Sequence, residues 1–254
     1  MRVQILTIFP ELFGAFLATS LVGKGIERGL LEVSVRDLRE FSRDRHRSVD
    51  DEPYGGGGGM VMKAPAWIDA VRALSQGRSP WRVLLSPQGR RLDDAAVREL
   101  AARDDLLLLC GRYEGIDERV RQTVVDDELS IGDFVLSGGE LPAMVLVEAI
   151  SREIPGVVQL AGSVERDSFR TGLLDHPHYT RPPEVEGRRV PEVLLSGDHA
   201  AIEAWRLRAA LEATLDKRPD LLERARLDPL QRRELERLLA RRAAGRPVAG
   251  SPDE

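Results

Sequence analysis

Residues 106–117 read Leu-Leu-Leu-Leu-Cys-Gly-Arg-Tyr-Glu-Gly-Ile-Asp, a short apolar run followed at once by a glycine-containing turn. The apolar part, Leu106–Cys110, has the length of a strand that is buried on both faces of a parallel sheet. Trp81–Leu85 is a second run of this kind. A helix is expected between the two runs, starting near Asp93, because parallel neighbours need a crossover connection. This stretch therefore predicts a strand–helix–strand unit.

The residues before this unit extend the same pattern. Val3–Phe9 and the alternating residues 31–35 predict two more strands. Between them, Pro10 suits the first turn of a helix whose apolar residues recur at helical spacing as far as Leu21. Gly23, Gly25 and Gly29 are expected to end that helix, and another helix is expected at 66–74. Strands that alternate with helices predict an α/β fold with a parallel sheet.

Composition narrows the class of protein. The chain has 254 residues, of which 42% are hydrophobic and 31% charged, enough apolar material for a sizeable core. The single cysteine, Cys110, excludes an internal disulfide and fits a reducing compartment. No apolar run reaches the length of a membrane span. We expect a cytoplasmic protein with no membrane association.

The character of the chain changes after Ile150. Proline-containing stretches without periodicity follow, and helical periodicity returns from Asp198 to about Arg242. We expect an α/β domain at 1–160, a linker at 161–175, a small helical domain at 176–246 and a disordered tail at 247–254. Arginines gather at 36–47 and 223–246, although the net charge is −5. These clusters are candidate contacts for nucleic-acid phosphates, and a solvated charged helix is the alternative for the second.

Three loops carry most of the unusual residues: 84–89, 110–117 and 131–142, the last of which is expected to surround a short strand and to open a helix. In an open parallel sheet, the loops at the carboxyl ends of the strands converge on the ligand crevice. Their glycines would expose backbone donors and acceptors to a flat ligand such as adenine. The alternative for each single glycine is a tight strand-to-helix turn.

A run of five glycines, Gly55–Gly59, adds a second unusual feature. Ordering such a run has a high entropic cost, which contact of a ligand with the bare backbone would offset. The alternative is a flexible surface loop. Gly23–Gly29 fits neither a dinucleotide fingerprint nor a Walker motif. His176-Pro-His178 offers at most half of a metal site, and we expect no bound metal there.

The chain resembles the bacterial tRNA (guanine-N1)-methyltransferase family over almost its whole length. The stretches that carry the resemblance are Asp44–Arg47, Asp50–Asp51, Pro53–Gly57, Ser86–Gly89, Gly111–Arg119, Ile131–Asp133, Leu136–Pro142, Asp167–Phe169, Gly172–Asp175, Pro177–Pro182 and Leu194–Gly197. The resemblance implies a SPOUT-type domain whose parallel sheet is tied into a deep trefoil knot, an exception to the rule against knots. It also implies S-adenosylmethionine as methyl donor, and a homodimer with active sites at the interface.

The resemblance also implies roles for residues. Cofactor contacts are expected from Leu85, Ser86, Pro87, Gly111, Tyr113, Glu114, Gly115, Ile131, Gly132, Asp133, Phe134, Val135, Leu136, Gly138, Gly139 and Pro142. Contacts with the tRNA are expected from Asp50, Tyr54, Gly55, Gly56, Gly57, Ser168, His178 and Arg181. Asp167 is expected as general base and Arg152 as the residue that positions the guanine. Assistance by Mg²⁺ is left open, with Glu114 as a contributor.

The chemistry of the implied reaction suits these two residues. Methylation of guanine at N1, here at position 37 of the tRNA, needs a base for the N1 proton and a cation near O6, where negative charge develops. Without the resemblance, Asp167 could merely cap a helix and Arg152 could merely complement a helix dipole. Two alternative functions stay open: another SPOUT-type enzyme acting on ribosomal RNA or on a ribose, and a noncatalytic RNA-binding protein.

Overall fold

The computed structural model describes residues 1–158 and 167–244. The chain divides into two compact units, Met1–Ala161 and Gly162–Glu254, and each unit is described by itself. The first six residues of the expected linker and the whole expected tail, 247–254, lie outside the described residues. Within the described ranges, no helix contains a stretch of apolar residues sufficient to span a lipid bilayer.

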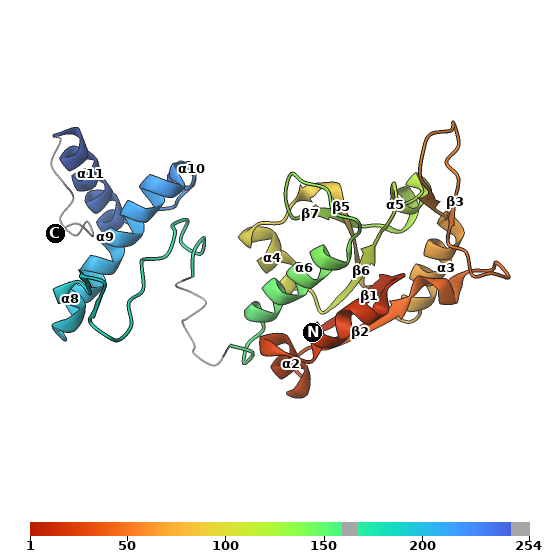
Figure 1. Ribbon diagram of the computed structural model, residues 1–254, viewed down its shortest axis with the longest axis horizontal. Helices are drawn as coiled ribbons and strands as arrows, with labels where there is room; N and C mark the ends of the chain where they lie inside the picture. Colours follow the sequence, from red (N-terminus) through yellow and green to blue (C-terminus); the bar gives the residue numbers. More distant parts are fainter. Residues whose placement is uncertain (159–166, 245–254) are drawn as a thin grey trace. The chain divides into compact units, whose positions relative to one another are not determined.

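The first unit is built on a five-stranded sheet in which all neighbours run parallel (Figure 1). Its strands are β1 (Arg2–Thr7), β2 (Glu32–Asp37), β5 (Trp81–Arg91), β6 (Asp105–Cys110) and β7 (Asp127–Ser130), in the spatial order β2-β1-β6-β5-β7. The two apolar runs that the sequence singled out are the neighbouring strands β5 and β6. The predicted α/β fold with a parallel sheet is confirmed.

Helices cover both faces of this sheet. One face carries α1 (Gly14–Leu17), α2 (Ser20–Glu27), α4 (Asp94–Ala101), α6 (Glu140–Glu153) and the 3₁₀ turn η1 (Pro10–Phe13), and the other carries α3 (Ala64–Leu74), α5 (Glu118–Val124) and the 3₁₀ turn η2 (Leu38–Phe41). Side chains of β6 alternate between the two cores: Leu106 and Leu108 pack with α6, whereas Leu107 and Leu109 pack with α3. A continuous apolar run is needed because both faces are covered.

The prediction for the first helix is wrong about where the helix breaks. Gly23 and Gly25 lie inside α2 instead of ending it, and the break falls earlier, before Ser20, whose φ is +59°. A Cβ on Gly23 would lie 2.8 Å from the backbone carbon of Ala18, and one on Gly25 would lie 3.3 Å from the Val157 side chain. These glycines therefore permit close packing of α2. Gly29 does follow the end of the helix, with φ +69°.

The strand predicted within residues 131–142 is also wrong. The strand of this region is β7, which precedes that loop, and residues 131–139 form bends and irregular structure before α6 begins at Glu140. The sequence of β7, Asp-Glu-Leu-Ser, lacks the apolar run that marks β5 and β6. β7 pairs with β5 on both sides of residues 86–89, because Leu129 is the partner of both Leu85 and Arg90.

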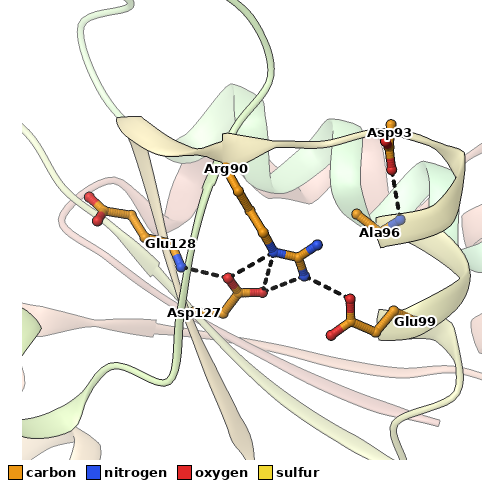
Figure 2. A network of polar contacts seen from close by, with 6 residues as sticks. All are labelled: Arg90, Asp93, Ala96, Glu99, Asp127 and Glu128. Atoms are coloured by element: carbon orange, nitrogen blue, oxygen red, sulfur yellow. Dashed lines mark hydrogen bonds and ion pairs between the residues drawn. The ribbon is translucent and has the colours of Figure 1, made fainter.

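An arginine fixes the second of these pairings. Arg90 donates from Nη2 to Asp127 Oδ2 at 2.7 Å and to Glu99 Oε2 at 3.0 Å, so it joins β5 to β7 and α4 (Figure 2). The same figure shows Asp93 accepting from the N–H of Ala96, the N-cap bond that begins α4 near the predicted position. This network holds the chain beyond residue 89 without reaching the loop itself.

A small hairpin brackets the glycine run. β3 (Asp50–Asp51) pairs antiparallel with β4 (Val61–Met62), so residues 52–60 form its loop. The second unit contains the short antiparallel strands β8 (Glu184–Val185) and β9 (Arg188–Arg189), followed by the helices α8 (Glu192–Leu195), α9 (His199–Lys217), α10 (Pro219–Leu222) and α11 (Pro229–Ala243). The core of that unit is small and includes Leu173, Leu211 and Leu238.

Candidate functional site

A cavity of about 230 Å³ lies at the carboxyl ends of β5, β6 and β7. Its walls come from residues 84–88 of β5, the loop at 111–116, and the end of β7 with the loop that follows it as far as residue 139, together with the first turns of α5 and α6. The structure thus brings together the three loops that the sequence singled out. This is the position at which open α/β sheets bind their ligands.

Every residue expected to contact a cofactor lines this cavity except Asp133. Residues that the sequence reasoning left out also line it: Leu84, Gln88, Arg112, Ile116, Glu118, Arg121, Glu128, Leu129, Ser130 and Ser137. Most of them are sequence neighbours of expected residues, so extending each predicted loop by a few residues would have included them. Nothing in the sequence indicates Arg121 and Glu128, because the fold of α5 and β7 brings these two residues to the cavity.

Two glycines let the loops approach this closely. A Cβ on Gly139 would lie 2.8 Å from Cys110 Cα, and one on Gly89 would lie 2.3 Å from the backbone nitrogen of Leu129. The N–H of Gly139 donates to the carbonyl oxygen of Gly111 at 2.9 Å. The segment before α6 therefore runs against the ends of both β5 and β6. Only residues without a side chain fit at these two positions.

Glu140 is a buried carboxylate that contacts the cavity lining without being part of it. Glu140 is 1% exposed, and its Oε1 accepts a hydrogen bond from Thr7 Oγ1 at 2.7 Å. Its Oε2 accepts from Arg112 Nε at 3.0 Å. Arg112 lies over the ring of Phe9, with 4.6 Å between Cζ and the ring centroid. Burial, and then the charge of Glu140, raise the pKa of the neighbouring Cys110 thiol well above its ordinary value.

The glycine run is connected to the cavity through β4. Met60 accepts a backbone hydrogen bond from Glu114 at 3.1 Å, and the N–H of Met62 donates to Gly115 at 2.9 Å. A Cβ on Gly59 would lie 2.3 Å from a carboxylate oxygen of Glu114. The end of the glycine run is thus fixed against the cavity loop at 111–116. Tyr54 is fully exposed at the other end of the run.

The remaining residues expected to bind the tRNA fall in two places. Asp50 lies on β3 and is half-buried, and Gly55, Gly56 and Gly57 are exposed with positive φ values. Ser168, His178 and Arg181 belong to the second unit. There the N–H of Asp175 donates to Ser168 Oγ at 2.9 Å, and His178 Nε2 lies 2.9 Å from Asp175 Oδ2. Arg181 is exposed.

Asp175, His176 and His178 place their ligand-type atoms within 4.8 Å of one another. The ring of His176 is also engaged, with Nδ1 3.2 Å from the carbonyl oxygen of Pro177. Burial disfavours the charged form of Asp175, but hydrogen bonds from His178 and from the N–H of His176 outweigh it and lower the pKa of this carboxyl group. The three side chains form one polar group, and the backbone N–H of Asp175 links this group to Ser168.

The two expected catalytic residues lie in different units. Arg152 is half-buried in the last turn of α6, and Asp167 is half-buried in a turn that begins the described part of the second unit. The carbonyl oxygen of Asp167 accepts from the N–H of Arg170 at 3.3 Å. Asp167 thus lies beside Ser168, and both belong to the turn that Asp175 contacts.

The family described as tRNA (guanine-1)-methyltransferase TrmD matches residues 1–224. A tRNA (guanine-N(1)-)-methyltransferase of Geobacter metallireducens is 53% identical over 236 residues, which cover 92% of this chain and 96% of the relative. A protein of the same name from Chromohalobacter salexigens is 51% identical over 98% of this chain and 96% of the relative. Another, from Halorhodospira halophila, is 51% identical over 100% of this chain and 97% of the relative. The chain therefore belongs to the tRNA (guanine-1)-methyltransferase TrmD family.

Proposed function

We propose that this protein transfers a methyl group from S-adenosylmethionine to N1 of guanosine 37 of tRNA, in the cytoplasm. The family and the relatives support tRNA guanine-N1 methylation as the reaction. The assignment of the cofactor rests on the cavity that the three glycine-containing loops form together. The assignment of position 37 rests on the likeness of the chain to its family.

The residues of the cavity suit this cofactor. The carboxylates of Glu114 and Glu128 complement a ligand that carries sulfonium and ammonium charges, and Leu85, Ile116 and Pro142 offer apolar contact to an adenine. When bound, S-adenosylmethionine supplies an activated methyl group, so the protein needs no nucleophile of its own. Its tasks are to hold both substrates and to manage one proton.

Asp167 is the proposed general base. Its carboxylate accepts the proton that N1 of neutral guanine carries, and Arg152 offsets the negative charge that develops on O6. A guanidinium suits this role because its planar fork donates several hydrogen bonds in one direction. Ser168 and His178, which Asp175 joins in one polar group, support a binding surface for the base next to Asp167.

Three further features belong to the proposal. The glycine run with Tyr54 covers the target base after it leaves its stack. The helices of the second unit grip the tRNA, although Arg206 and Arg208 already pair with Glu203 and Glu234 there. A SPOUT-type knot belongs to the proposal through the likeness of the chain to its family.

The test is incubation of unmodified tRNA with labelled S-adenosylmethionine. Asp167→Asn is expected to lower kcat at least about 100-fold, since general-base catalysis contributes roughly 10²–10⁴-fold. Asp104→Asn, which changes an exposed carboxylate outside the site, should match the wild type. Digestion of the tRNA and mass spectrometry would identify the product. A methylated ribose or a ribosomal RNA product would favour another SPOUT-type activity, and the absence of transfer would favour a noncatalytic RNA-binding protein.

A further inference from the structure

Glu140 is almost completely buried, yet it is not among the residues that line the cavity. A buried carboxylate is costly unless it is paired and hydrogen-bonded, and here Thr7 and Arg112 provide the two bonds. Both donors face carboxylate oxygens at good distances. The arrangement fixes Glu140 as the point at which β1, the loop after β6 and the start of α6 meet.

Arg112 is the partner that reaches the cavity. Its Nη1 lies 3.3 Å from Ser137 Oγ, and both residues line the cavity wall. Arg112 therefore joins the loop at 111–116 to the segment at 137–139. Its guanidinium is held between Glu140 and the ring of Phe9. Without the carboxylate, this side chain would lose the hydrogen bond that, together with the contact with Phe9, directs it toward Ser137.

We propose that Glu140 is a positioning residue for the cofactor, acting through Arg112 and never touching the ligand. By fixing Arg112 it holds the two glycine-containing walls at the separation that S-adenosylmethionine requires. This inference rests on the proposed function. Its consequence is that Glu140 sets the affinity for the cofactor, whereas the chemical step depends on Asp167 and Arg152.

The experiment measures the Kd of S-adenosylmethionine by calorimetry without tRNA, and then the KM and kcat of methyl transfer. Glu140→Gln should raise both the Kd and the KM for the cofactor at least about tenfold, because a charge-assisted bond to Arg112 is replaced by a neutral one. At saturating cofactor, kcat should stay within about threefold of the wild type. Arg112→Lys should act in the same direction, since an ammonium group lacks the fork that reaches Glu140 and Ser137 together.

Two substitutions at Thr7 perturb the buried site less than Glu140→Gln does. Thr7→Val removes the hydroxyl that donates to Glu140 while keeping the shape of the side chain, and Thr7→Ser keeps the hydroxyl. The valine variant should weaken cofactor binding and the serine variant should restore it. This pair keeps the inference testable if Glu140→Gln fails to fold.

Asp127 is the matched control. Like Glu140, it is paired with an arginine (Figure 2). Its side chain is 10% exposed and does not line the cavity. Asp127→Asn should lower the Tm and leave the Kd unchanged. The inference is overturned if Glu140→Gln binds the cofactor as the wild type does, or if Asp127→Asn weakens binding equally. Wild-type protein that does not bind S-adenosylmethionine at all would overturn the proposed function as well.

Discussion

At Gly89 two backbone segments approach so closely that a side chain has no room. A Cβ at this position would lie 2.3 Å from the backbone nitrogen of Leu129 and 2.4 Å from the carbonyl carbon of Glu128. Both obstacles are backbone atoms of β7, so no side-chain rotation relieves the clash. The pairing of β5 with β7 after the loop at 86–89 therefore depends on glycine here.

Gly89→Ala is expected to lower the free energy of unfolding by about 1–3 kcal/mol, the usual cost of overpacking. Thermal unfolding checks this. The control is Gly14→Ala, because Gly14 is in a helical conformation with nothing within 4 Å of an added Cβ. Equal Tm values for the Gly89 variant and the wild type would show that β7 can move aside.

At the scale of the element, the backbone conformation of the glycine loop restricts substitution at some positions, although there is room for a side chain. Gly57 has φ +113°, a conformation that L-residues rarely adopt, whereas Gly58 has no such φ, and neither position has any atom within 4 Å of an added Cβ. The loop therefore needs glycine for backbone conformation at one of these neighbours and not at the other.

Gly57→Ala should reduce kcat/KM for tRNA at least about fivefold, because a side chain in the left-handed region costs roughly 1–2 kcal/mol. Gly58→Ala should stay within about twofold of the wild type. Methylation rates at limiting tRNA provide the measurement. If the two variants behave alike, the conformation of the loop plays no part in the use of tRNA.

The sequence predicted some elements better than others, for physical reasons. β5 and β6 were found because both of their faces are buried, which requires apolar runs. The sequence does not reveal β7, because this strand is short and acidic. It wrongly predicts a helix end at Gly23, because in a sequence a glycine that permits close packing cannot be told from one that ends a helix. The Arg112–Glu140 bond joins residues 28 positions apart, so no local pattern could reveal it.

At the scale of the whole molecule, the first unit has apolar side chains that its own fold leaves uncovered. Val135 is 82% exposed, Leu141 57%, Phe134 54% and Val145 46%. Phe134 and Val135 lie in the loop before α6 and also line the cavity, whereas Leu141 and Val145 share one face of α6 and do not line it. A concentration of exposed apolar residues of this kind marks an interaction surface. It supports the expected homodimer, with a second copy of this chain as the partner.

Replacing both Leu141 and Val145 by aspartate should therefore convert a dimer into monomers, because two charges would be buried without partners, and neither residue lines the cavity. Sedimentation at micromolar protein would show the change in mass, and methyl transfer should fall at least about tenfold if the active site needs both copies. Leu230→Asp changes a residue that is 65% exposed on α11 and should leave the dimer intact. A wild-type protein that sediments as a monomer, or a double variant that remains a fully active dimer, would exclude this surface as the interface. A monomeric variant with full activity would instead confine each active site to one chain.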